Sequence, residues 1–113
     1  MPFGRGGAPQ SWKILLGDNY ASATIHAIAE EVDAGPIVVQ KKKLIKDQYP
    51  EPIDYIVAEK EICEELIDKL MKTLKESKEL TFTAQDHNNS FYLSRLYTEV
   101  NGAIDWDWAI FYV

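Results

Sequence analysis

Alternation of apolar and polar residues with a period of two predicts a strand over residues 21–32, broken only by Ile28. The odd positions are apolar: Ala21, Ala23, Ile25, Ala27 and Ala29. Polar residues stand between them: Ser22, Thr24, His26 and Glu30. This pattern is typical of a strand with one buried face. A second strand, apolar at first and lysine-rich at its end, is predicted over residues 37–44 after the turn signal Gly35-Pro36. The two segments predict a β-hairpin with Asp33 at its bend.

A second pattern, with steps of three and four residues, predicts one long helix roughly over residues 54–76. Its apolar positions are Ile56, Cys63, Leu66, Ile67, Leu70, Met71 and Leu74. The opposite face carries acidic residues early and basic residues late, as the helix dipole favours. A shorter helix is predicted over residues 10–16, because Pro9 suits a first helical position and Gly17 an end.

The remaining segments are shorter and more polar. The glycine-rich residues 1–8 predict a loop, residues 80–83 a short strand and residues 85–90 a polar loop. After these, two apolar and aromatic segments, 91–97 and 104–108, flank the turn signal Asn101-Gly102. The expected fold is a single α+β domain over residues 1–113, with a hairpin, one long helix and short C-terminal strands.

Composition narrows the functional classes. The chain has 113 residues, which suffices for one domain but not for two independent cores. Its net charge of −6 disfavours a surface that follows nucleic-acid phosphates. Cys63 is the only cysteine, so an intramolecular disulfide and a Cys-x-x-Cys zinc or redox site are excluded. No run reaches the roughly 18 apolar residues of a membrane span, and residues 1–10 lack a signal-peptide core. We expect a cytoplasmic protein with neither a nucleic-acid nor a membrane partner.

Asp33 and His26 are the candidate catalytic residues. A carboxylate at a tight bend beside a strand histidine can form a proton-transfer pair that is held rigidly yet reachable from a cleft. The alternatives stay open at this point: Asp33 as a turn former and His26 as a half-buried hydrogen-bonding residue.

Two further motifs have functional and ordinary interpretations. Arg5 lies between glycines, where it either presents its guanidinium to a substrate or occupies a solvent-exposed loop. The surrounding glycines do not form a phosphate-binding loop, since no Gly-Lys-Ser/Thr follows. Asp86 and His87 lack a third ligand at a suitable spacing, so we expect an ordinary loop there and no metal site.

The order and spacing of four motifs resemble the N10-formyltetrahydrofolate-dependent formyltransferase family. These motifs are Pro2-Phe3-Gly4-Arg5-Gly6-Gly7-Ala8-Pro9, Gly17-Asp18, Thr24-Ile25-His26 and Glu31-Val32-Asp33-Ala34-Gly35-Pro36-Ile37. A weaker likeness continues through Tyr92-Leu93-Ser94-Arg95-Leu96 and Asn101-Gly102-Ala103-Ile104-Asp105-Trp106. The likeness covers most of the chain and implies the second half of an α/β catalytic domain.

The resemblance also implies a reaction and a set of site residues. Family members move a formyl group from the folate carrier to an amine, using an Asn, a His and an Asp around the tetrahedral intermediate. Asp33 matches that aspartate, and His26 would help to hold its carboxylate and a water. By the same resemblance, substrate or cofactor binding falls to Arg5, Gly6, Gly7, Val32 and Gly35. The implied co-substrate is N10-formyltetrahydrofolate, and the implied acceptor is a small amine such as an amino sugar.

The chain departs from the family pattern at its beginning. The family's Asn and catalytic His belong to a motif just upstream of the Arg-Gly loop, and the chain starts at Met1-Pro2. We therefore expect negligible transfer by this chain alone, and either a homo-oligomer or a partner chain that supplies the N-terminal half. A second hypothesis is a non-catalytic module of the same fold. A third, an unrelated α+β binding domain, predicts that the Asp33 and His26 side chains point apart.

Overall fold

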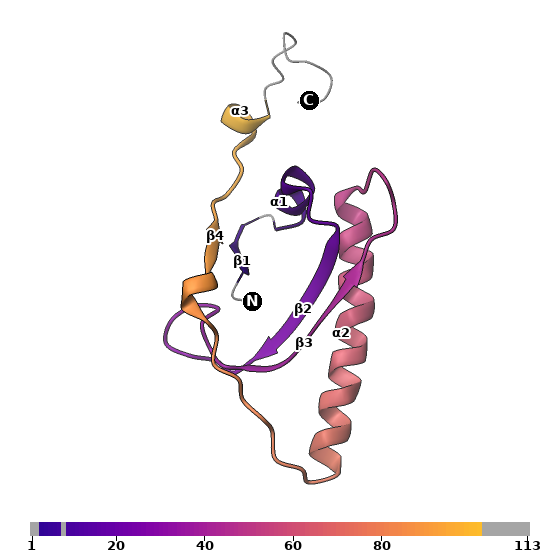
Figure 1. Ribbon diagram of the computed structural model, residues 1–113, viewed down its shortest axis with the longest axis vertical. Coiled ribbons are helices and arrows are strands. Elements are labelled where there is room, and N and C mark those ends of the chain that lie inside the picture. The colour runs from indigo at the N-terminus through magenta and orange to yellow at the C-terminus, as the bar shows by residue number, and fades with distance from the viewer. Residues whose placement is uncertain (1–2, 8, 103–113) are drawn as a thin grey trace.

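The computed structural model describes residues 3–7 and 9–102 of the chain, and Figure 1 shows the arrangement of its elements. The strands are β1 (Phe3–Gly6), β2 (Tyr20–His26), β3 (Ile37–Leu44) and β4 (Phe91–Leu93). The helices are α1 (Pro9–Leu16), α2 (Pro52–Lys75), the single-turn 3-10 helix η1 (His87–Asn89) and α3 (Thr98–Asn101). The strand predicted over residues 104–108 lies outside the described residues.

Strands β2 and β3 form the predicted antiparallel hairpin, which runs along one side of α2 (Figure 1). The odd positions of β2 face the helix, with Ala21 fully buried and Ala23 and Ile25 packed against the same core. The predicted hairpin and its buried face are therefore confirmed. A mixed fold with one long helix and small sheets is confirmed as well.

The first strand is shorter than predicted, because it ends at His26 and residues 27–36 form a loop. Pro36 has no backbone N–H to donate, so beyond Ile37 the β3 side offers only the Pro36 carbonyl, which accepts from the Ala27 N–H at 2.9 Å. Ile28 is 99% exposed, which agrees with the break that it makes in the alternation. Asp33 thus lies in a wide loop at the end of the hairpin rather than in a tight two-residue turn.

Helix α2 spans the predicted region but buries a different stripe. Its buried residues are Tyr55, Ala58, Ile62 and Leu66, which also recur at steps of three and four. Of the predicted positions only Leu66 is buried, whereas Ile56, Cys63, Ile67, Met71 and Leu74 are exposed. We call these five residues the outer α2 stripe. Both stripes satisfy helical periodicity, and contact with the hairpin decides which one is covered.

Polar contacts attach α2 to the hairpin and to the segment just before it. The Tyr55 hydroxyl, on a side chain with no exposed surface, donates to the Asp18 carbonyl at 2.8 Å. Burial raises the pKa of that hydroxyl, and the nearby carboxylates of Asp18 and Asp54 raise it further. On the outside, Lys43 pairs with Glu61 and Lys41 with Glu65.

The two outer ion pairs shift pKa values in the expected directions. The hydrogen bond to Glu61 raises the pKa of Lys43, and the hydrogen bond from Lys41 lowers the pKa of Glu65. Because all four groups are solvated, such pairs orient β3 on α2 more than they stabilise the fold.

In the glycine-rich entry, residues 3–6 form strand β1 rather than the predicted loop. Strand β1 pairs in parallel with β4, and the Gly7 N–H donates to the Leu93 carbonyl at 3.1 Å. Gly6 has a φ of +117°, and a Cβ there would lie 2.0 Å from the Leu93 oxygen, so only glycine permits this approach.

Two other predicted strands are shorter in the structure. The one over residues 80–83 is reduced to a bridge between Thr83 and Ile37, and the one over residues 91–97 is ordered as strand only in β4. Within residues 3–7 and 9–102, no helix combines the length and apolar character needed to cross a bilayer.

The choice between the two α2 stripes can be tested with one pair of substitutions. Ile62→Ala should lower the free energy of unfolding by about 2–5 kcal/mol, because it opens a cavity among fully buried residues. Ile67→Ala removes the same atoms from a side chain that is 53% exposed, so its effect should stay below about 1 kcal/mol. Denaturant unfolding of both variants measures the difference, and equal losses would contradict the packing described above.

Candidate active site

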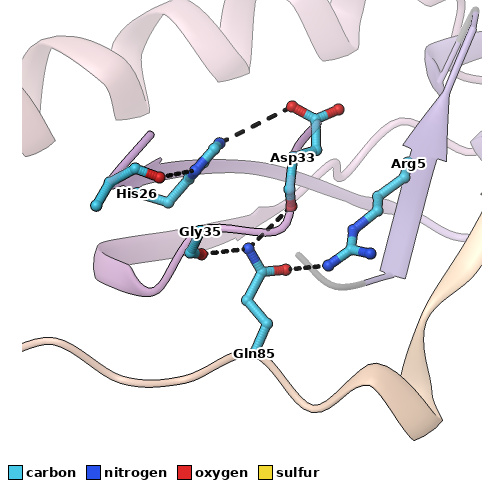
Figure 2. Close-up of polar contacts among 6 residues, drawn as sticks. Arg5, His26, Asp33, Gly35 and Gln85 are labelled. Atoms are coloured by element: carbon cyan, nitrogen blue, oxygen red, sulfur yellow. Dashed lines mark hydrogen bonds and ion pairs between the residues drawn. The ribbon is translucent and has the colours of Figure 1, made fainter. Parts of the chain in front are cut away.

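The end of β2 and the loop after it bring His26 and Asp33 together. The His26 Nε2 and Asp33 Oδ1 atoms are 3.9 Å apart, and the side chains are 21% and 39% exposed. Figure 2 shows the Asp33 carboxylate directed at the imidazole. The two groups therefore face one another while both stay accessible, as the resemblance implies. The hypothesis of an unrelated binding domain predicted that they would point apart.

The tautomer of His26 follows from the hydrogen bond that its Nδ1 atom makes. Nδ1 lies 2.9 Å from the Ala27 carbonyl oxygen, which can only accept, so Nδ1 must carry a proton. In the neutral ring, Nε2 then presents a lone pair towards Asp33. The Nε2 lone pair and the Asp33 carboxylate can both accept a hydrogen bond from one donor placed between them, such as a water or the N–H of an amine. The pair is thus arranged to take a proton from a donor.

Gly35 makes this arrangement possible through a close backbone approach. A Cβ at Gly35 would lie 1.7 Å from the Ala27 oxygen and 3.2 Å from His26 Nδ1. The Ala27 oxygen is the acceptor that orients the imidazole, so the glycine and the histidine depend on the same carbonyl. Asp33, two residues earlier, has a φ of +57°, a left-handed conformation that Asp tolerates better than most side chains.

Arg5 is buried rather than in an exposed loop, so that alternative is wrong. It is 9% exposed and lies in β1. Its guanidinium donates to the Gln85 Oε1 atom at 2.7 Å and to the Ser90 hydroxyl at 3.1 Å. Figure 2 shows it turned towards Gln85, on the far side of that amide from the loop carrying Asp33.

Gln85 is the member of the cluster that sequence reasoning missed. It is 6% exposed, and its Nε2 donates to the carbonyl oxygens of Asp33 at 2.9 Å and Gly35 at 2.6 Å. No local signal marks it, because Gly35 is 50 residues away and Arg5 is 80 residues away in sequence. A polar residue in a predicted loop gives no sign of such burial.

The other predicted binding residues lie around this cluster. Gly6 and Gly7 lie against the C-terminal segment, with the Cβ position of Gly7 3.5 Å from the Arg95 Cα. Val32 is 81% exposed on the loop beside Asp33. Their part in binding stays a prediction.

Asp86 and His87 lie at the start of the single-turn helix η1, within the polar loop predicted over residues 85–90. The Asp86 carboxylate accepts from the Asn88 N–H and the Asn89 amide, and so caps η1. In the part of the chain that the structure describes, no three His, Cys, Asp or Glu side chains gather where a metal ion could bind.

A protein-family model described as "Formyl transferase" matches residues 1–70, which carry β1, the hairpin and the His26–Asp33 pair. The match extends over more than half of the chain. The chain belongs to the formyl transferase family.

Solved structures with the same fold include three formyltransferases. An N-formyltransferase from Helicobacter canadensis, in complex with folinic acid and dTDP-3-aminofucose, superposes with a TM-score of 0.79 at 22% identity over 99% of this chain. A 4-N formyltransferase from Francisella tularensis gives a TM-score of 0.73 at 24% identity over 96%. The methionyl-tRNA formyltransferase from Clostridium thermocellum gives a TM-score of 0.66 at 19% identity over 97%.

The chain spans less than half the length of each of these proteins, namely 41%, 43% and 44%. At these identities the likeness establishes the shared fold.

The role of Gly35 can be tested by adding a single methyl group. Gly35→Ala should destabilise the protein by about 1–3 kcal/mol, because the new Cβ collides with the Ala27 backbone. It should also release His26 Nδ1 from its acceptor, which ¹⁵N NMR of the imidazole would detect as a change of tautomer. Gly7→Ala is the matched control, since its Cβ would meet Arg95 at ordinary contact distance. A Gly35→Ala protein with the parent's stability and imidazole spectrum would rule out the close approach as a requirement.

Proposed function

We propose that this chain supplies the aspartate side of a formyl-transfer site, in which an amine of a small acceptor receives a formyl group from N10-formyltetrahydrofolate. The observation that carries the proposal is the His26 Nε2 atom facing the Asp33 carboxylate at 3.9 Å, in a chain of the formyl transferase family. The co-substrate supplies an activated formyl carbon. The acceptor amine must lose a proton as it forms the new C–N bond, while the bond between the formyl carbon and N10 breaks and the tetrahydrofolate nitrogen leaves with a proton.

Asp33 is suited to accept that proton, either directly or through one water. Its carboxylate is 39% exposed, so an acceptor can reach it, and its partner His26 is oriented by the Ala27 carbonyl. The Nε2 lone pair is a second acceptor for the same donor, which aligns the amine or water towards the carboxylate. Positioned acid–base groups of this kind contribute roughly 10²–10⁴-fold to rate.

A small amine is the preferred acceptor. The H. canadensis enzyme of the same fold was crystallised with folinic acid and a dTDP-aminosugar. A methionyl-tRNA formyltransferase also shares the fold, but the net charge of −6 disfavours an RNA acceptor here. An amino sugar on a nucleotide carrier therefore fits the available observations best.

We further propose that transfer requires a second polypeptide segment covering the outer α2 stripe. Four of its side chains, Ile56, Ile67, Met71 and Leu74, are 46–53% exposed. Exposed apolar side chains along one face of a helix favour association. The resemblance to the family suggests that the segment is the N-terminal half with its Asn and His, and a second copy of this chain is the alternative occupant.

Reconstitution tests the transfer. The chain is mixed with a polypeptide carrying the family's N-terminal half, and formyl incorporation is measured with N10-formyltetrahydrofolate and an amino-sugar nucleotide. Asp33→Asn should lower the rate by about 100-fold or more, because the amide cannot take the proton. Asp68→Asn, the same change at an exposed position of α2, should leave it unchanged. Equal rates for Asp33→Asn and the parent would overturn the catalytic role, and ordinary turnover by the isolated chain would overturn the need for a second segment.

The apolar stripe makes a separate prediction about association. Without a partner the chain should self-associate at high concentration, and Ile67→Glu should reduce this by placing a charge in the stripe. Light scattering measures both proteins, with Val57→Glu as the control, since Val57 is 51% exposed on α2 but is outside the stripe. A monodisperse monomer for the parent chain at high concentration would contradict the prediction.

A further inference from the structure

One buried amide joins three segments that are far apart in sequence. The Gln85 Nε2 donates to the Asp33 and Gly35 carbonyl oxygens at 2.9 and 2.6 Å, and Oε1 accepts from Arg5 at 2.7 Å (Figure 2). Carbonyl oxygens cannot donate and a guanidinium cannot accept, so only one orientation of the amide satisfies all three contacts. The contacts therefore determine the direction of the Gln85 side chain.

Arg5 strengthens the hydrogen bonds that the Gln85 amide donates to the loop. Its guanidinium carries a positive charge, yet among residues 3–7 and 9–102 it forms no ion pair with a carboxylate. Its acceptors are instead neutral oxygens, those of Gln85 and Ser90. A charge-assisted hydrogen bond to Oε1 polarises the amide and makes its N–H groups better donors. The positive charge of Arg5 thus acts on the loop through Gln85.

The loop that Gln85 holds has a conformation that needs support. Asp33 has a φ of +57°, a left-handed conformation that is unfavourable for L-amino acids in general, although less so for Asp than for most. Gln85 binds the carbonyl oxygens of Asp33 and Gly35, and therefore anchors the Asp33–Ala34 and Gly35–Pro36 peptide units. Gly35 also lies against the Ala27 carbonyl that orients His26. One amide therefore supports both members of the pair.

We propose that Gln85 is a positioning residue, which holds the Asp33 carboxylate opposite His26, and that Arg5 acts through Gln85 rather than on a substrate. This inference rests on the proposed function, because the part played by Asp33 in transfer belongs to it. The held geometry itself can be measured without turnover.

Gln85→Glu separates positioning from packing. Glutamate has the size of glutamine, and its carboxylate can still accept from Arg5, so the buried cation keeps its partner. Both amide donors are lost, however, and a negative charge faces two carbonyl oxygens. Gln48→Glu is the matched control, because it makes the same change at an exposed position in the connector between β3 and α2.

Hydrogen exchange of the full chain is the first measurement. The Ala27 N–H donates to the Pro36 carbonyl at 2.9 Å and closes the base of the loop. In Gln85→Glu this amide should exchange at least about tenfold faster, since the loop has lost two anchors, while the Ile62 amide in α2 keeps its protection. Gln48→Glu should match the parent. Unchanged protection of Ala27 in Gln85→Glu would overturn the proposal.

A double-mutant cycle in the reconstituted site is the second measurement. Gln85→Glu should lower kcat by about 10–100-fold with little change in KM, because a displaced catalytic group slows the reaction more than it weakens binding. In the Asp33→Asn background it should cause no further loss, since it acts through Asp33. Losses that multiply would show that Gln85 acts elsewhere and would overturn the proposal. Absence of transfer by the parent would count against the proposed function alone, because the exchange comparison needs no turnover.

Discussion

The buried amide of Gln85 is the contact on which the geometry of the site depends. Gln85 belongs to the segment leading to η1. Its side chain is hydrogen-bonded to Arg5 in β1 and to the Asp33 and Gly35 carbonyls in the loop after β2 (Figure 2). Without it, Arg5 would be a buried cation lacking its shortest hydrogen bond, and the carbonyls of Asp33 and Gly35 would lose their shared donor. Leaving buried polar groups unpaired costs about 1–3 kcal/mol each, so the cluster is a strong local constraint.

The hairpin and α2 provide the packed core of the structure, and the loop after β2 carries Asp33. Tyr55, Ile62 and Ala21 form a core with almost no exposed surface, which fixes β2 against the helix. His26 ends that strand and takes its position from the core, whereas Asp33 takes its position from the loop anchors. The pair therefore combines His26, at the end of a strand packed on the core, with Asp33, on a loop fixed by hydrogen bonds. Such an arrangement sets a short distance while keeping both groups reachable.

The outer α2 stripe adds a constraint of a different kind. A helix with an apolar face on the hairpin and a second apolar stripe beside it is built to contact two surfaces. The family's solved structures are more than twice as long as this chain, which agrees with an additional contact surface.

Local patterns determined the parts of this protein that depend on neighbours in sequence. The hairpin followed from the alternation over residues 21–32, the turn signal Gly35-Pro36 and the apolar start of residues 37–44, and the extent of α2 followed from its period and dipole. The candidate pair followed from a carboxylate at the bend, Asp33, beside a strand histidine, His26. Only the tertiary structure decided the pairing of β1 with β4, the buried stripe of α2, the burial of Arg5 and the role of Gln85. Each of these depends on contacts between residues far apart in the chain, for which periodicity carries no information. Two equally periodic helix faces, or two equally polar loop residues, differ only in what the rest of the fold places against them.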